Sequence, residues 1–138
     1  GRTYTEAFGV DCDQSALANI IRGHRAATTA SRRYCNKVLI LDTDPVLTLV
    51  WADMLTGSRA GLGVSKDDLA DLYLLTDIDV PWVNDGTRYF PDAGARRTFF
   101  ERCKAELVVR GLPHVTLSGA WAQREATAIA AVQSLINS

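Results

Sequence analysis

Cysteine is scarce in this sequence of 138 residues, and the few cysteines present are far apart. Cys12, Cys35 and Cys103 form no Cys-x-x-Cys pair, and only two histidines accompany them. An odd number of cysteines with such spacing argues against a disulfide framework and against a structural zinc site. Reduced, buried thiols are therefore expected.

An excess of charge of either sign is also missing. The chain has 15 basic and 16 acidic residues, which gives a formal net charge of −1. Without a broad basic field the chain is not expected to bind nucleic acid as its main partner, although a local group of arginines could still hold a small phosphate.

Long apolar runs are absent as well. None of the apolar stretches could span a bilayer, and the first residues lack the basic, apolar and small-residue pattern of a signal peptide. We therefore expect a cytoplasmic protein with no membrane partner. With 47% hydrophobic and 22% charged residues, the composition is typical of one folded domain over residues 1–138 with a real core.

Apolar runs of strand length alternate with segments of helical periodicity. The continuous runs KVLILD and DLYLLT are typical of strands buried in a parallel sheet. Capping residues and glycines mark the helices between them. The expected order is a helix to about residue 33, a strand at 37–42, a helix from Pro45 to Gly57, a strand at 71–76, a helix ending at Gly111, a strand at 114–118 and a helix at 121–136. This order predicts an α/β fold, a parallel sheet with helices on both faces.

Acidic side chains follow both of the clearest strands. Asp42 and Asp44 end the first, and Asp77, Asp79 and Asp85 follow the second. Ligands of parallel α/β sheets gather at the carboxyl ends of the strands. Carboxylates there could hold Mg²⁺ through water, accept a hydrogen bond from a substrate hydroxyl or take its proton. Helix capping and turn formation are the alternative for Asp44 and Asp77.

The segment TDIDVPWVNDGTR after the second strand also carries an arginine and a tryptophan. Arg88 follows Asp85 and Gly86, which suits bidentate contact with a phosphate, but a solvated surface arginine would look the same. Trp82 could stack on a flat ring or could simply anchor the loop.

Three stretches, CNKVLILDTDPVLTLVW, DLYLLTDIDVPWVNDGTR and SGAWAQREATAI, occur in this order and spacing. Together with Gly1-Arg2 and with Gly23-His24, they make the chain resemble the ribosylnicotinamide kinase domain of NadR-type proteins and related small P-loop kinases of the AAA-type ATPase-like group. The motifs are weak singly and fairly specific as a set.

The resemblance implies transfer of phosphate from ATP, with Mg²⁺, to the 5′-hydroxyl of a nucleoside, and nicotinamide riboside is the favoured acceptor. It gives catalytic roles to Asp42, which would order Mg²⁺ and its waters, to Asp44, which would lie near the ribose of the acceptor, and to Arg88, which would close on the phosphates. Such a site works by positioning and charge neutralisation.

The resemblance also implies binding roles. Arg2 would contact the acceptor, while Trp82 and Asp85 would shape the same lid as Arg88. Arg88 and Arg124 would bind the nucleotide cofactor. Thr3, however, stands where the family usually has glutamate.

No Gly-x-x-x-x-Gly-Lys-Ser/Thr motif occurs in the chain. We therefore expect residues 1–138 to be the carboxyl-terminal part of a longer P-loop kinase-like domain that lacks the first strand and the phosphate loop. In the family this strand lies between those corresponding to 37–42 and 71–76, so an upstream segment, another chain or a rearranged sheet has to fill the gap. Two alternatives to the nucleoside kinase stay open: a nucleotide-binding regulatory or assembly module without activity, and a kinase of the same fold with another small acceptor.

Overall fold

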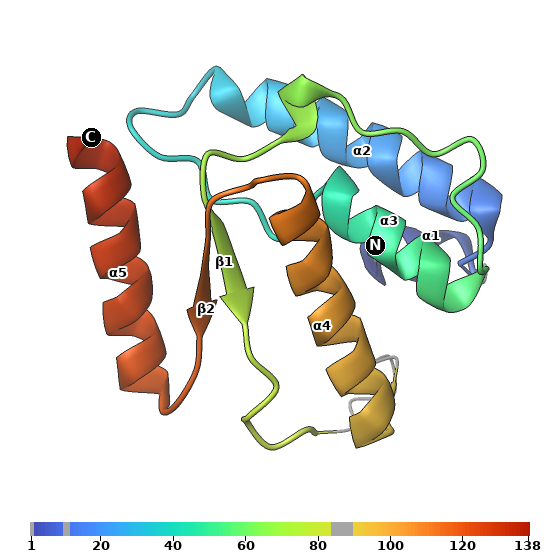
Figure 1. The fold of residues 1–138 in the computed structure, drawn as a ribbon. Helices are drawn as coiled ribbons and strands as arrows, with labels where there is room; N and C mark the ends of the chain where they lie inside the picture. The colour runs from blue at the N-terminus through green and yellow to red at the C-terminus, as the bar shows by residue number, and fades with distance from the viewer. Residues whose placement is uncertain (1, 10–11, 84–89) are drawn as a thin grey trace. The chain divides into compact units, whose positions relative to one another are not determined.

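The computed structural model describes residues 2–9, 12–83 and 90–138, without the side chains of residues 2, 3 and 5. It divides into two compact units, residues 1–69 and 70–138, and each is described by itself (Figure 1). The first unit contains the helices α1 (Arg2–Phe8), α2 (Gln14–Arg32) and α3 (Pro45–Leu55) and the 3₁₀ turn η1 (Lys66–Asp68). The second contains β1 (Tyr73–Thr76), α4 (Ala93–Val109), β2 (His114–Leu117) and α5 (Trp121–Asn137).

Helix α2 begins where the sequence predicts. The Asp13 carboxylate accepts a hydrogen bond of 2.7 Å from the backbone N–H of Ala16, which satisfies one of the open donors of the first turn. Leu17, Ile20 and Ile21 are buried on one face, as their helical spacing predicts, and α2 packs against α3 along this side.

Helix α3 starts with Asp44 as its N-cap and Pro45 in its first turn. Its buried residues lie on more than one side, so α3 is the central element of this unit; they are Pro45, Val46, Thr48, Leu49, Val50 and Ala52. Gly57 follows the helix with a φ of 66°, a backbone conformation that favours glycine, and the predicted end of the helix is therefore confirmed.

The predicted strand at 37–42 is wrong for this structure. Residues 38–41 have no regular secondary structure, and three apolar side chains, Val38, Ile40 and Leu41, are exposed, with Ile40 at 78%. A strand is stable only when its N–H and C=O groups pair with a neighbour. Among the described residues of the first unit there is no strand with which this apolar run could pair.

The second unit confirms the α/β class with a small parallel sheet. β1 and β2 pair in parallel from Tyr73 opposite His114 to Thr76 opposite Leu117. Parallel strands need a crossover, and α4 provides it. Figure 1 shows α4 and α5 on opposite sides of this strand pair. The predicted helices and strands of this unit are thus all present.

The apolar stripe predicted on α5 is only partly buried. Ile129 and Ile136 are exposed, and the one buried residue of the helix is Arg124, at 4% exposure. Helix α5 contacts β2, but a pair of four-residue strands offers too little surface to cover a helix of this length.

The three cysteines of the structure differ in burial. None of the three cysteines forms a disulfide, and only Cys103 is fully buried, so the expectation of buried thiols is correct for one of the three. Among the helices that the structure describes, none has the length and apolar character needed to cross a membrane.

Candidate functional site

The predicted site residues fall into both units. Asp42 and Asp44 belong to the first unit, while Trp82 and Arg124 belong to the second. Asp85 and Arg88 lie outside the described residues, so the predicted phosphate contact and the lid stay predictions. Arg2 is the first residue of α1, and its side chain is also outside the described part.

Asp44 is buried at the start of α3, with an exposure of 6%. Its Oδ1 accepts a hydrogen bond of 2.9 Å from the backbone N–H of Leu47, which confirms the capping role that the sequence left open. Its backbone C=O accepts from Thr48, through both the N–H and the hydroxyl. The second carboxylate oxygen, Oδ2, is buried and has no hydrogen-bond partner among the described residues. Capping therefore uses only half of this carboxylate.

The two residues before Asp44 differ from it in environment. Thr43 has a φ of 68°, in the left-handed region that a β-branched residue avoids, at a cost of about 1–2 kcal/mol. Asp42 is exposed and makes no ion pair with any described residue. Strain of this kind persists only where surrounding structure enforces it, and it is frequent at ligand sites. The segment thus presents one solvated and one buried carboxylate, separated by a strained residue.

His24 joins this group from α2. Its Nε2 lies 3.4 Å from the Thr43 hydroxyl, and its Nδ1 is buried without a partner among the described residues. Burial lowers the pKa of His24 below its ordinary value, although the Asp44 carboxylate, a hydrogen bond to the Asp44 backbone and the Asp42 carboxylate act in the opposite direction. The ring is therefore mainly neutral at pH 7.

The sequence interpretation gave His24 no role in the site. A signal was nevertheless present, because His24 follows Ile20 and Ile21 at the spacing of the buried face of α2. A polar side chain at such a position needs a partner, and here that partner is the segment around Asp44.

Arg124 is the centre of a network in the second unit. Its Nε donates to the Gly119 carbonyl at 2.8 Å, and its two terminal nitrogens lie 3.3 and 3.4 Å from the Asp77 carbonyl. Arg124 also forms an ion pair with Asp79, whose Oδ2 accepts from the Gly119 N–H at 2.6 Å. Arg124 therefore ties the end of β1 to the end of β2. The role in nucleotide binding implied by the resemblance stays untested, and in this structure the guanidinium is bound to its own loops.

Asp77 has a similar structural role. Its Oδ1 accepts from the N–H of Ile78 and lies 3.4 Å from the Arg97 guanidinium. The turn-forming interpretation of Asp77 is thus the one that the structure supports. The acidic group after β1 stabilises loops through arginines, in contrast to Asp42 and Asp44, which form no ion pair with any described residue.

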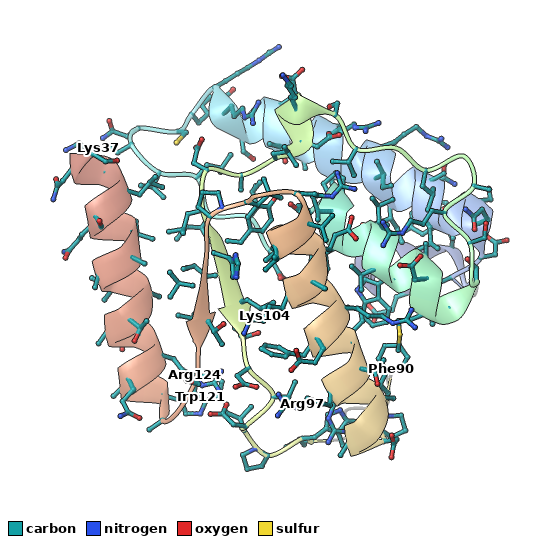
Figure 2. All side chains as sticks on the ribbon, in the orientation of Figure 1. Lys37, Phe90, Arg97, Lys104, Trp121 and Arg124 are labelled. Atoms are coloured by element: carbon teal, nitrogen blue, oxygen red, sulfur yellow. The ribbon has the colours of Figure 1, made fainter. Side chains whose placement is uncertain are left out.

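Two tryptophans of the second unit lie against arginines. The Arg96 guanidinium is 5.4 Å from the centre of the Trp82 ring, so Trp82 anchors its loop through a cation–π contact. Trp121 is 74% exposed, and its ring lies 5.7 Å from the Arg124 guanidinium. Figure 2 shows Trp121 and Arg124 at the same end of α5.

Other features of the described residues add no site. A shallow hollow of about 430 Å³ lies along α2, lined by Arg25, Ala26, Thr29, Ala30, Arg33 and Tyr34, and none of these was predicted as a site residue. Across residues 2–9, 12–83 and 90–138, no three His, Cys, Asp or Glu side chains are grouped so that they could hold a metal ion. A metal at Asp42 would therefore depend on water and on a bound phosphate for most of its ligands.

The comparison with known proteins identifies a family. A family model described as an AAA domain matches residues 3–124, which is well over half of the chain. No curated protein and no solved structure matches the chain significantly.

Proposed function

Because this chain belongs to the AAA-domain family, a P-loop NTPase-like family of nucleotide-binding domains, we propose that it phosphorylates a nucleoside with ATP. The proposed acceptor is nicotinamide riboside, the product is nicotinamide mononucleotide, and the proposed compartment is the cytoplasm. The family and the small parallel sheet support a nucleotide-binding domain of the P-loop kinase-like type. The choice of acceptor rests on the resemblance to NadR-type kinases.

The observation that carries this proposal is that only one of the two carboxylate oxygens of Asp44 has a hydrogen-bond partner among the described residues. Oδ1 fixes the side chain by capping α3, and Oδ2 is left as a buried acceptor without a partner among the described residues. A rigid, buried acceptor of this kind suits a donor group on a small ligand, such as a sugar hydroxyl. Asp44 would therefore orient the acceptor.

Asp42 fits a role with Mg²⁺. It is exposed and has no competing ion pair in the described part of the chain, so its carboxylate is open to a hydrated cation. Mg²⁺ in nucleotide sites keeps several waters and takes one or two carboxylates together with phosphate oxygens. Bound in this way, Mg²⁺ would neutralise charge on the transferring phosphate.

The phosphates of ATP need a second source of ligands. The sequence has no phosphate loop motif, and the glycine-rich segment at 57–63 does not have its spacing. We propose that residues 1–138 form the carboxyl-terminal part of a longer domain, in which a further strand and a phosphate loop complete the site. The exposed, unpaired apolar run at 38–41 supports this proposal, because an added strand would cover it.

The missing phosphate loop motif also favours a second candidate. A nucleotide-binding regulatory or assembly module would need the fold of the family and would not need transfer chemistry. A kinase with another small acceptor would use the same residues as the nucleoside kinase and would differ in its acceptor pocket. The module would form no phosphorylated product, and the other kinase would phosphorylate a different acceptor.

The test uses two capping aspartates that differ in environment. Asp44→Asn and Asp13→Asn both keep a side-chain oxygen that can cap, since asparagine is also a good N-cap. Only Asp44 has a buried unpartnered oxygen, whereas Asp13 is exposed. In the full-length protein, Asp44→Asn is expected to lower kcat/KM for nicotinamide riboside by about 100-fold, while Asp13→Asn leaves it within about twofold. Equal effects of the two substitutions would contradict the role of Asp44.

A further inference from the structure

Two buried polar atoms in the first unit have no hydrogen-bond partner among the described residues. They are Nδ1 of His24 and Oδ2 of Asp44. The His24 ring also meets Thr43, the residue directly before Asp44, and both the backbone and the carboxylate of Asp44 act on the ring. The two residues with unpartnered atoms therefore lie together, where α2 meets the start of α3.

Leaving such atoms without partners is costly. A buried donor or acceptor without a partner loses its hydrogen bonds to water and gains none in return, which destabilises the folded state. Neither atom is needed to hold the helices, because Oδ1 alone caps α3 and the apolar residues of α2 provide its packing. The contacts of His24 with Thr43 and with the Asp44 backbone link α2 to α3, but they provide no partner for Asp44 Oδ2 or for His24 Nδ1, whereas a bound ligand would.

We propose that His24 and Asp44 together bind hydroxyl groups of a sugar and that His24 is a specificity-determining residue. The inference rests on the proposed function, and it identifies the ribose hydroxyls of the acceptor as the groups that are recognised. Asp44 Oδ2 accepts a hydrogen bond from one hydroxyl. His24 Nδ1 pairs with the same hydroxyl or with its neighbour.

The chemistry of the ring favours a diol over other ligands. If Nε2 accepts from the Thr43 hydroxyl, Nδ1 carries the proton and donates to a ligand oxygen; in the other tautomer, Nδ1 accepts. A hydroxyl can both donate and accept, so a vicinal diol satisfies Asp44 and either form of His24.

Charged ligands fit this place less well. A phosphate without Mg²⁺ would meet the two carboxylates of Asp42 and Asp44, so it would be repelled. A metal ion held by protein side chains alone would find no group of three ligands among the residues that the structure describes.

The two histidines of the chain make a direct test possible. His114 belongs to β2, and its Nδ1 lies 2.9 Å from the Leu112 carbonyl, so it serves as the internal reference. Ring signals of both histidines are recorded by NMR in the full-length protein while nicotinamide riboside, its 2′-deoxy analogue or its 3′-deoxy analogue is added. The proposal expects the riboside to shift the His24 signal alone and at least one deoxy analogue to lose most of this shift. Equal His24 shifts with all three compounds, or no shift with any, would overturn it.

Substitutions measure the contribution of His24. The wild-type protein is expected to bind the riboside about 10- to 100-fold more tightly than the deoxy analogue, the range for one hydrogen bond to a charged or buried polar group. His24→Phe keeps a ring without polar atoms and is expected to reduce this discrimination by about tenfold. His24→Gln, which keeps a donor and an acceptor, is expected to restore part of it, and His114→Gln is expected to leave it unchanged. Wild-type discrimination in His24→Phe would refute the inference.

The failure of this inference can be told apart from the failure of the proposed function. Hydroxyl-dependent shifts of His24 without any phosphorylated product would keep the binding role and overturn the kinase. Phosphorylation that does not distinguish the riboside from its deoxy analogues would keep the kinase and overturn the role of His24.

Discussion

Replacing Asp68 with asparagine is expected to destabilise the first unit in a pH-dependent manner. Asp68 binds Arg25 through two hydrogen bonds of 2.7 Å, from Nε to Oδ1 and from Nη2 to Oδ2. The backbone N–H of Ser65 adds a bond of 2.7 Å to Oδ2, and Arg25 Nη2 also donates to the Gly63 carbonyl at 2.8 Å. One carboxylate thus holds η1 and the end of the glycine-rich loop against α2.

The size of the effect follows from the pKa of Asp68. The ion pair with Arg25 lowers this pKa from 3.8 to about 2. A fall of this size corresponds to at most about 2.5 kcal/mol of stability at neutral pH. Because the Arg25 side chain is 42% exposed, water and salt screen the pair, and we expect a loss of about 1–2 kcal/mol in Asp68→Asn.

The sign of the pH dependence follows from the direction of the shift. A carboxyl whose pKa is lower in the folded state contributes stability above its unfolded pKa, and this contribution is lost as the pH falls toward the folded value. The difference in the free energy of unfolding between wild type and Asp68→Asn should therefore be full at pH 6 and should shrink between about pH 4 and pH 2.

Urea denaturation at several pH values measures this difference. Asp67→Asn is the matched control, because Asp67 is an exposed neighbour whose substitution makes the same change in charge. The control should cost less than about 0.5 kcal/mol. A loss in Asp68→Asn that does not vary between pH 6 and pH 2, or an equal loss in Asp67→Asn, would refute the reasoning.

Three further predictions concern the predicted site. Asp42→Asn is expected to abolish Mg²⁺-dependent turnover while the melting temperature stays within about 2 °C, because Asp42 is exposed; wild-type turnover would exclude its metal role. Arg88→Ala is expected to lower kcat/KM for ATP by an amount that corresponds to about 2–4 kcal/mol of lost transition-state stabilisation, whereas a deletion within 57–63 should lower it less. A larger loss from the deletion than from Arg88→Ala would exclude the phosphate role of Arg88. Arg124→Ala should lower the free energy of unfolding by about 2–3 kcal/mol, since it leaves the Asp79 carboxylate and two carbonyls without their donor; wild-type stability in urea would contradict this structural role.

Local signals in the sequence predict the helices well. Asp13 and Asp44 cap as expected, and the glycines at 57 and 111 follow their helices with positive φ. These features depend on neighbours along the chain, so capping and glycine rules are sufficient to find them. The parallel pair β1 and β2 is also correct, because its crossover helix lies between the strands in the sequence.

Features that depend on distant partners were predicted less well. The run at 37–42 has the composition of a buried strand, but a strand also requires a neighbour, and composition does not provide one. Ile129 and Ile136 are a second example. Their helical spacing is correct, but no described residue of their own unit buries them.

In the candidate site, too, local features were predicted and contacts between distant residues were not. Asp44 was predicted from its place after an apolar run, and the structure adds that only one of its oxygens is used. His24 belongs to the site because α2 packs against α3, and its place in the Gly23-His24 pair gave it no role in the sequence interpretation. Asp77 and Asp79 were interpreted from their place after a strand, and Arg124 from the family resemblance, but their mutual contacts make them a structural network in this unit.

The most direct test of the central claim is the detection of product. The full-length protein is incubated with ATP, Mg²⁺ and nicotinamide riboside, and ³¹P NMR follows the formation of a 5′-phosphate monoester together with ADP. The proposed function predicts nicotinamide mononucleotide in amounts equal to the ADP formed, and about 100-fold slower formation of this product in Asp44→Asn at low riboside concentration. Binding of ATP without transfer to this or any other nucleoside would contradict it and would favour a nucleotide-binding module.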